Sequence, residues 1–319
     1  MLRRRALAGL FAAALLPRLR IARADAPLAI VATIGQIADL ARHVAGARAT
    51  VRALMGEGVD PHTYRPTRAD VLALRRADLM LANGLRLEAQ LEELLLALAS
   101  EKPVLRLAER LPAERLLAHP DFPGKFDPHL WMDVALWSEL LPILAGELSR
   151  LDPTDAAGYR ERVHTYAAEL AALERYVRSV LETVPPERRV LITAHDAFGY
   201  FGRAYGFEVH GIQGLSTESE AGLAEIERLV RLLVERRIAA VFVESSVSER
   251  NVRALLEGAA ARGHTVRIGG QLFSDAMGAP GTYEGTYVGM IDHNVTVIAR
   301  ALGGTAPPRG MHGRLASVG

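Results

Sequence analysis

The sequence predicts an α/β protein of two lobes with mostly parallel sheets, joined by a single long linking helix. Short apolar runs alternate with amphipathic stretches in both halves of the chain, an order typical of parallel sheets flanked by helices. Between the two halves lies one uninterrupted helical pattern. The 319 residues, half of them hydrophobic, suffice for two domains that each bury a core.

The first half contains short apolar runs typical of strands and stretches with apolar residues three or four positions apart, typical of helices. A Gly-rich loop over 55–64 follows the second run. The expected elements are a strand over 28–33, a helix over 37–44, strands over 51–54 and 79–82, helices over 67–75 and 87–98, and a strand over 104–107.

A long helix is expected over 154–184. Asp152 can cap its start, Pro153 suits its first turn, and Pro185-Pro186 end it. About 30 residues at 1.5 Å each give a rod of about 45 Å, long enough to span both lobes. Its apolar residues are spaced by threes and fours: Tyr159, Val163, Tyr166, Leu170, Leu173, Val177, Val180 and Val184.

The alternation resumes after this helix. The expected strands cover 190–193, 208–211, 239–244 and 266–268, and the expected helices cover 198–205, 223–236, 247–262 and 286–302. The predicted organisation is therefore a signal peptide over 1–24, an N-terminal lobe over 25–152, a linking helix over 153–184 and a C-terminal lobe over 185–319.

The amino terminus has the pattern of a cleaved secretory signal. Arginines occupy positions 3–5, an apolar run covers 7–16, and Ala22 and Ala24 stand at the spacing that a signal peptidase reads. Ten apolar residues are too few to span a bilayer, which needs about 20. The chain contains no cysteine, so a lipid-modified cysteine is not expected. We therefore expect a periplasmic protein that is not a lipoprotein, exported by the Sec or the twin-arginine route.

Charge argues against a nucleic-acid partner. Six of the 38 Lys and Arg residues lie within 1–24, which holds no Asp or Glu. Residues 25–319 therefore carry 32 basic and 37 acidic side chains, a net charge of about −5. The electrostatic footprint of a nucleic-acid-binding protein is absent from this composition.

Three histidines stand in settings that suit metal binding. The tripeptide Asp-Pro-His occurs twice, ending at His62 and at His129, each time ahead of a helix, and His195 directly follows the strand expected over 190–193. Neutral imidazole is a good ligand for zinc and similar ions. Each histidine has an aspartate nearby that could orient its ring.

A carboxylate would complete such a site. Asp275 lies just beyond the strand expected over 266–268, and Glu244 ends another strand and is the second candidate. The remaining histidines lack comparable settings and are expected at the surface or in packing roles. Trp131 and Trp137 are expected to be core residues beside the site.

The chain resembles the TroA-like (cluster A-I) solute-binding proteins of zinc and manganese ABC importers. The resemblance covers nearly all of the chain after the leader. It rests on four segments, Gly58-Val59-Asp60-Pro61-His62-Thr63-Tyr64-Arg65-Pro66, Asp127-Pro128-His129-Leu130-Trp131-Met132-Asp133, Thr193-Ala194-His195-Asp196-Ala197-Phe198-Gly199-Tyr200 and Leu272-Phe273-Ser274-Asp275.

The resemblance implies one divalent metal ion, Zn²⁺ or Mn²⁺, held as cargo between the lobes. His62 and His129 would come from the first lobe, and His195 and Asp275 from the second. It further implies a monomer that delivers the ion to an ABC-transporter membrane permease. The loop over 111–126 is shorter than in many zinc-specific relatives, and many manganese-specific relatives have glutamate in place of His195. The sequence therefore leaves the choice of ion open.

Other functions remain as alternatives. A secreted zinc-dependent hydrolase would need an open coordination position, which four protein ligands would close, and the His-Glu-x-x-His motif is absent. A surface adhesin-like interaction protein is a further alternative, as is a binder of haem or a larger chelate. The sequence favours a binding protein over an enzyme.

Overall fold

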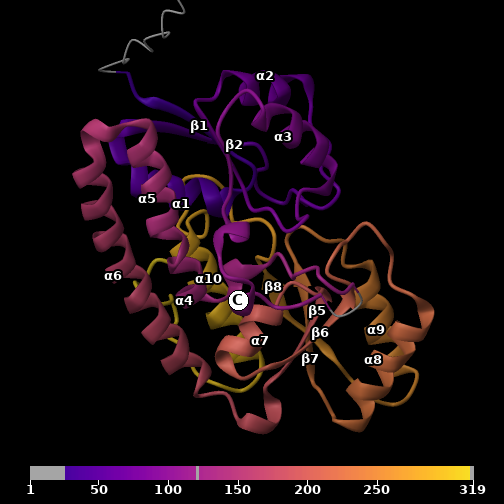
Figure 1. Ribbon diagram of the computed structural model, residues 1–319. Helices are drawn as coiled ribbons and strands as arrows, with labels where there is room; N and C mark the ends of the chain where they lie inside the picture. Colours follow the sequence, from indigo (N-terminus) through magenta and orange to yellow (C-terminus); the bar gives the residue numbers. More distant parts are fainter. Residues whose placement is uncertain (1–25, 120–121, 317–319) are drawn as a thin grey trace, which may run out of the picture.

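The computed structural model describes residues 26–119 and 122–316, and the leader predicted over 1–24 lies outside these ranges (Figure 1). The first lobe is built on a four-stranded sheet with the strand order β2-β1-β3-β4, in which every pairing is parallel. Its strands are β1 (Leu28–Ala32), β2 (Ala49–Ala53), β3 (Leu79–Ala82) and β4 (Val104–Arg106). Short apolar strands in parallel pairing confirm the predicted sheet type.

The described part of this half of the chain also contains the helices α1 (Gly35–Ala45), α2 (Arg68–Arg76), α3 (Glu92–Ala99), α4 (Val134–Ser138) and α5 (Leu140–Leu151). The first three pack against the sheet, whereas α4 and α5 pack against the long helix that follows them. The helix α2 begins with a capping box, in which Thr67 and Asp70 bind each other's backbone N–H groups. The sequence analysis expected a helix after His129 without giving its bounds, and it did not predict α5. Pro142 lies in the first turn of α5, where a missing N–H costs no helical hydrogen bond.

The predicted long helix is α6 (Ala156–Leu181), preceded by a 3-10 turn over Pro153–Asp155. It runs along the whole molecule beside both lobes (Figure 1). Asp152 was expected to cap the helix, but its side chain accepts no backbone hydrogen bond there. Its carboxylate accepts hydrogen bonds from Arg48 at 2.7 Å and from Tyr159 at 2.9 Å, so it fastens the helix start to the first lobe.

The second lobe contains two parallel pairs, β5 (Val190–His195) with β6 (Glu208–Gln213) and β7 (Ala240–Glu244) with β8 (Arg267–Leu272), and β5 lies beside β7. Its helices are α7 (Gly199–Tyr205), α8 (Leu223–Glu235), α9 (Arg250–Ala260) and α10 (Tyr287–Ala301). The strand β8 continues through Gly269 and Gly270 past the predicted end at 268. A Cβ at Gly269 would lie 2.7 Å from the Phe242 ring, so glycine allows the strand to pass close to β7.

One hydrophobic core extends across both lobes, and a smaller core lies between β5, β7 and the outer helices α8 and α9. The large core includes residues of β1, α6 and α10. It is continuous because α6 packs against α10 of the second lobe and against α1 of the first lobe, and α1 in turn packs against β1. The lobes are therefore not separated by a layer of solvent-exposed residues.

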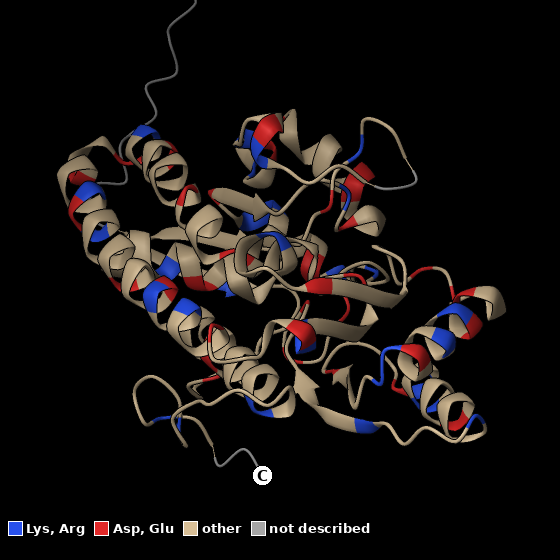
Figure 2. Ribbon diagram, turned by 90° about the horizontal axis from the view of Figure 1, so that it is seen from below, with Lys and Arg blue, Asp and Glu red and all other residues tan. Residues whose placement is uncertain are grey.

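Basic and acidic residues are interspersed along the long helix and along the outer helices of the second lobe (Figure 2). Within the ranges that the structure describes, no helix is both long and apolar enough to cross a membrane.

Candidate metal centre

Two of the candidate ligands lie at the ends of second-lobe strands, and the other two lie in loops of the first lobe. His62 lies in the loop after β2, and His129 immediately precedes a 3-10 helix over Leu130–Met132. His195 is the last residue of β5, and Asp275 follows the end of β8 by three residues. The carboxyl ends of parallel strands are where α/β sheets gather ligands, and in the folded chain the loops of the first lobe bring His62 and His129 to the strand ends of the second lobe.

Ligand atoms of the four residues all lie within 4.8 Å of one another, and all four residues are buried. The Nε2 atoms of His62 and His129 are 3.2 Å apart. Oδ1 of Asp275 lies 3.5 Å from Nε2 of His129. Oδ2 of the same carboxylate lies 3.6 Å from Nε2 of His62 and 3.1 Å from Nε2 of His195.

These separations fit a bound ion better than a set of direct hydrogen bonds. Two ligand atoms at about 2.1 Å from a tetrahedral zinc ion are about 3.4 Å apart. Nε2 of His195 and both carboxylate oxygens of Asp275 have no hydrogen-bond partner among the described residues, although all three atoms are buried. Buried polar atoms in native proteins are nearly always paired, so these three point to a group that binds between them.

Neighbouring carboxylates orient two of the three rings. Nδ1 of His129 lies 2.8 Å from Oδ1 of Asp127, which also accepts the backbone N–H of His129. This confirms the expected aspartate for His129. For His62 the expectation is wrong, because Asp60 accepts the backbone N–H at 2.9 Å and does not bind the ring.

For His195 the orienting residue is Glu244, which the sequence suggested as a second candidate ligand. One carboxylate oxygen of Glu244 lies 2.5 Å from Nδ1 of His195, and the other accepts the backbone N–H of His195 at 2.8 Å. Asp196, the neighbour expected to do this, makes no such contact. Glu244 thus lies on the far side of the ring from Asp275 and leaves Nε2 facing the other ligands.

Burial and charge set the protonation of the site. Burial, together with His129 and His195, lowers the pKa of His62 to about 3 against the attraction of Asp275, so this ring is neutral at neutral pH. Burial alone would lower the pKa of His195, but the charges of Glu244 and Asp275 raise it well above its usual value. Burial would raise the pKa of Asp275, but the three histidines, His195 foremost, bring it well below its usual value.

Two first-lobe residues hold the segment of Asp275 in place: Gln36, which the sequence did not single out, and Trp131, which was expected beside the site. Nε2 of Gln36, on α1 of the first lobe, donates to the carbonyl oxygen of Asp275 at 3.1 Å. The indole N–H of Trp131, another first-lobe residue, donates to the carbonyl oxygen of Ser274 at 2.9 Å. Both contacts cross between the lobes, and both tryptophans are fully buried, as expected.

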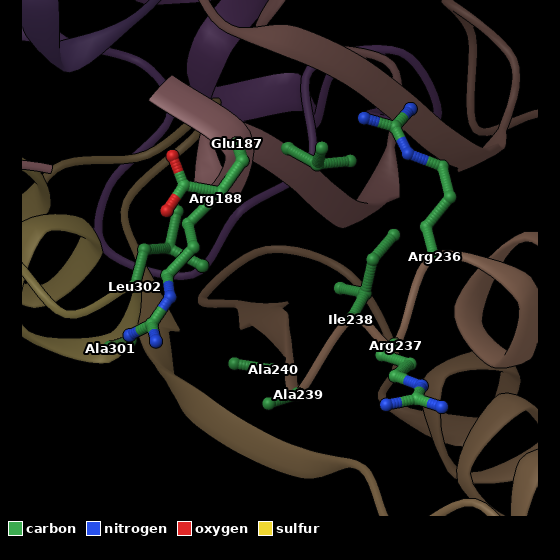
Figure 3. A pocket seen from close by; sticks show the side chains of 10 residues that line it. Glu187, Arg188, Arg236, Arg237, Ile238, Ala239, Ala240, Ala301 and Leu302 are labelled. Carbon is green, nitrogen blue, oxygen red and sulfur yellow. The ribbon is translucent and has the colours of Figure 1, made fainter. Parts of the chain in front are cut away.

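Other histidines lie outside this cluster. His164 is exposed on α6, His43 stacks on Tyr166, and Nε2 of His264 lies 2.8 Å from the carbonyl oxygen of Ile238. A separate cavity of about 390 Å³ opens at the amino ends of β5 and β7. Figure 3 shows Glu187 and Arg188 on one side of it and Arg236 and Arg237 on the other. It lies a strand length away from His195 and has no part in the centre.

The fold and the convergent donor atoms define a class: a two-lobed binding protein with a buried site for one metal ion between the lobes. The family described as "Zinc-uptake complex component A periplasmic" (ZnuA) matches residues 30–301. The chain belongs to this ZnuA/TroA family of metal-binding proteins of ABC transporters.

Two similar proteins illustrate the relationship. The manganese-binding lipoprotein MntA of Bacillus subtilis (strain 168) is 46% identical over 280 residues, 88% of this chain and 91% of MntA. The zinc-binding protein TroA of Treponema pallidum (strain Nichols) is 46% identical over 281 residues, with the same coverage of 88% and 91%. The solved structure of periplasmic zinc-binding TroA from T. pallidum matches with a TM-score of 0.84 and 45% identity, covering 87% of this chain and 99% of that chain.

The comparisons contradict one prediction, that the protein is not a lipoprotein. MntA of B. subtilis, SloC of Streptococcus mutans and PsaA of Streptococcus mitis, all similar to this chain, are named lipoproteins. The prediction relied on the lack of cysteine in this sequence, and the names of these relatives overturn it.

Proposed function

We propose that the protein captures one divalent transition metal ion, zinc or manganese, between its lobes and delivers it to an ABC permease for import. His62, His129, His195 and Asp275 are the proposed ligands. The observation that supports this most directly is the set of three buried, unpaired atoms, Nε2 of His195 and both carboxylate oxygens of Asp275, beside the Nε2 atoms of the other two histidines.

Binding rather than catalysis suits this geometry. Family members are substrate-binding components of transporters, and four converging protein ligands leave no open coordination position for a reacting water, as a zinc hydrolase requires. The site is also closed to substrates, because His62 is 3% exposed and His129 and His195 are fully buried.

The donor set accommodates either ion. Three imidazoles favour zinc, whereas a carboxylate that presents two free oxygens adds the oxygen ligands and the higher coordination number that manganese accepts. The names of the two relatives at 46% identity divide in the same way, one manganese-binding and one zinc-binding. Family membership therefore leaves the choice of ion to direct measurement.

We further propose that the lobes comprise residues 25–152 and 185–319, that residues 153–184 link them, and that the protein acts as a monomer. The shared core and the cross-lobe contacts of Gln36 and Trp131 favour small tilts and loop changes over a wide hinge motion.

Metal titration of the purified, metal-stripped protein tests the proposal. We expect one ion per chain for Zn²⁺ or Mn²⁺, and a loss of at least about 100-fold in affinity for H129A, H195A or D275A, since each removes one of four ligands. H164A, at an exposed histidine of α6, is the matched control and should bind as the unchanged protein does. Unchanged affinity in the three ligand variants would refute the assigned site.

A further inference from the structure

Of the four proposed ligands, His62 borders a cavity that is lined by residues of both lobes. A cavity of about 380 Å³ borders this histidine and none of the other three ligands. Its walls come from both lobes, with Leu85 and Arg86 from the first and Leu215 and Ser216 from the second. Asp275 borders a different cavity, but its side chain is fully buried. His62 is therefore the proposed ligand that separates this cavity from the other three.

A segment of the second lobe forms one wall of this cavity. Residues 214–222, here called the strap, connect β6 to α8. In the strap, the hydroxyl of Thr217 donates to Oδ2 of Asp60 in the first lobe at 2.5 Å. Beside it, Nε2 of Gln90 in the first lobe donates to the carboxylate of Glu218 at 2.6 Å, in an exposed position.

Asp60 forms hydrogen bonds both to the strap and to the loop that carries the ligand His62. Its Oδ1 accepts the backbone N–H of His62 at 2.9 Å, and its Oδ2 accepts the hydroxyl of Thr63 at 3.0 Å as well as that of Thr217. One carboxylate therefore holds the His62 loop in shape and binds the opposite lobe at the same time. Among the contacts described here, no other side chain of the strap reaches this loop.

We propose that Thr217 is a positioning residue for metal release: its hydrogen bond to Asp60 holds the strap closed over His62 and sets the rate at which the ion leaves. This inference rests on the proposed function of the site. The bond joins a hydroxyl to a carboxylate in a half-buried setting, where such charge-assisted bonds are stronger than neutral ones. If a docked membrane protein displaces the strap, the hydrogen bond between Thr217 and Asp60 breaks. The loop that carries His62 then has no hydrogen bond to the strap and can move away from the ion.

Stopped-flow release of Zn²⁺ into a chromophoric chelator tests the role of Thr217. We expect T217V to release the ion about 5- to 20-fold faster, with a smaller change in the association rate, and T217S, which keeps the hydroxyl, to release at nearly the original rate. The matched control is T154V. Thr154 makes the same kind of bond, to Asp152 at 2.5 Å, at the start of α6 far from the site, and its loss should leave release unchanged.

A double-mutant cycle shows whether Thr217 acts through Asp60. D60A should also speed release, and adding T217V to D60A should change the rate by less than about twofold if the two residues act as one unit. Release by T217V at the original rate, or fully additive effects in the cycle, would overturn the inference. If the unchanged protein binds neither Zn²⁺ nor Mn²⁺, the proposed function itself fails, and this result is distinct from normal binding with unaltered release. Matching melting temperatures of metal-free T217V and T217S would show that faster release does not reflect general unfolding.

Discussion

Replacing Glu244 by glutamine should weaken metal binding although Glu244 is not a proposed ligand. Its two oxygens accept the ring Nδ1–H and the backbone N–H of His195, at 2.5 and 2.8 Å, in a fully buried position. An amide has one acceptor oxygen, so it can satisfy only one of these two donors. If the amide NH₂ faces the ring, Nδ1 must accept, and the ring proton moves to Nε2, the atom that would bind the ion.

The expected loss is about 10- to 100-fold in affinity, as for other residues that orient a metal-bound histidine. That range corresponds to about 1.4 to 2.7 kcal/mol of binding free energy. Competitive titration against a chromophoric chelator measures it directly. The control is D196N, at the acidic neighbour of His195 that makes no hydrogen bond to the ring, for which we expect a change of less than about threefold. An E244Q affinity within threefold of the unchanged protein, with D196N weakened instead, would show that the reasoning is wrong.

Four further outcomes are expected. The affinity for the metal ion should fall as pH falls, by up to about tenfold per pH unit. The pKa of His195 is raised, so its ring must lose a proton before the ion can bind. Metal titrations at pH 8 and at pH 6 check that binding is weaker at the lower pH. Saturation at about 1,000 times Kd should add about 4 kcal/mol of stability and raise the melting temperature by about 7 °C in calorimetry. A ligand that also binds the unfolded chain would add less stability. W131F should lower the free energy of unfolding in urea by about 1–3 kcal/mol, since the indole N–H bond to Ser274 is buried, and an unchanged midpoint would contradict this. Small-angle scattering of the metal-free and loaded forms should give nearly superimposable profiles, and a large domain rotation would contradict the small-tilt mechanism.

The fold was predictable where the periodicity is strong. The strand over Leu79–Ala82 matches its predicted bounds. The helix α8 differs from its predicted bounds by one residue at one end, and α10 differs by one residue at each end. Predictions failed where tertiary packing overrides local signals. The strand β8 runs through Gly269-Gly270 and past its predicted end because it stays paired with β7 as far as Leu272. Glycine is needed at position 269 because the Phe242 ring leaves no room there for a side chain.

The candidate ligands could be named from local motifs and a family resemblance, and the structure brings them together. Their supporting residues could not be named in this way. Glu244 lies 49 residues from His195, Gln36 lies 239 residues from Asp275, and Thr217 lies 157 residues from Asp60. The nearest acid in the sequence was a good guide only for His129, whose loop folds back on Asp127 two residues before it. Which residues support a ligand depends on how the two lobes meet, and no short pattern encodes that.

The hydrophobic core that extends across both lobes also affects how long the protein survives. Because residues of β1, α6 and α10 share one core, we expect the chain to unfold as one cooperative unit, so an ion bound where the lobes meet protects all of it. Proteases that cleave transiently opened chains would then remove the empty form faster than the loaded one. Metal supply would thus control the abundance of the binding protein through its rate of degradation, without any change in its synthesis.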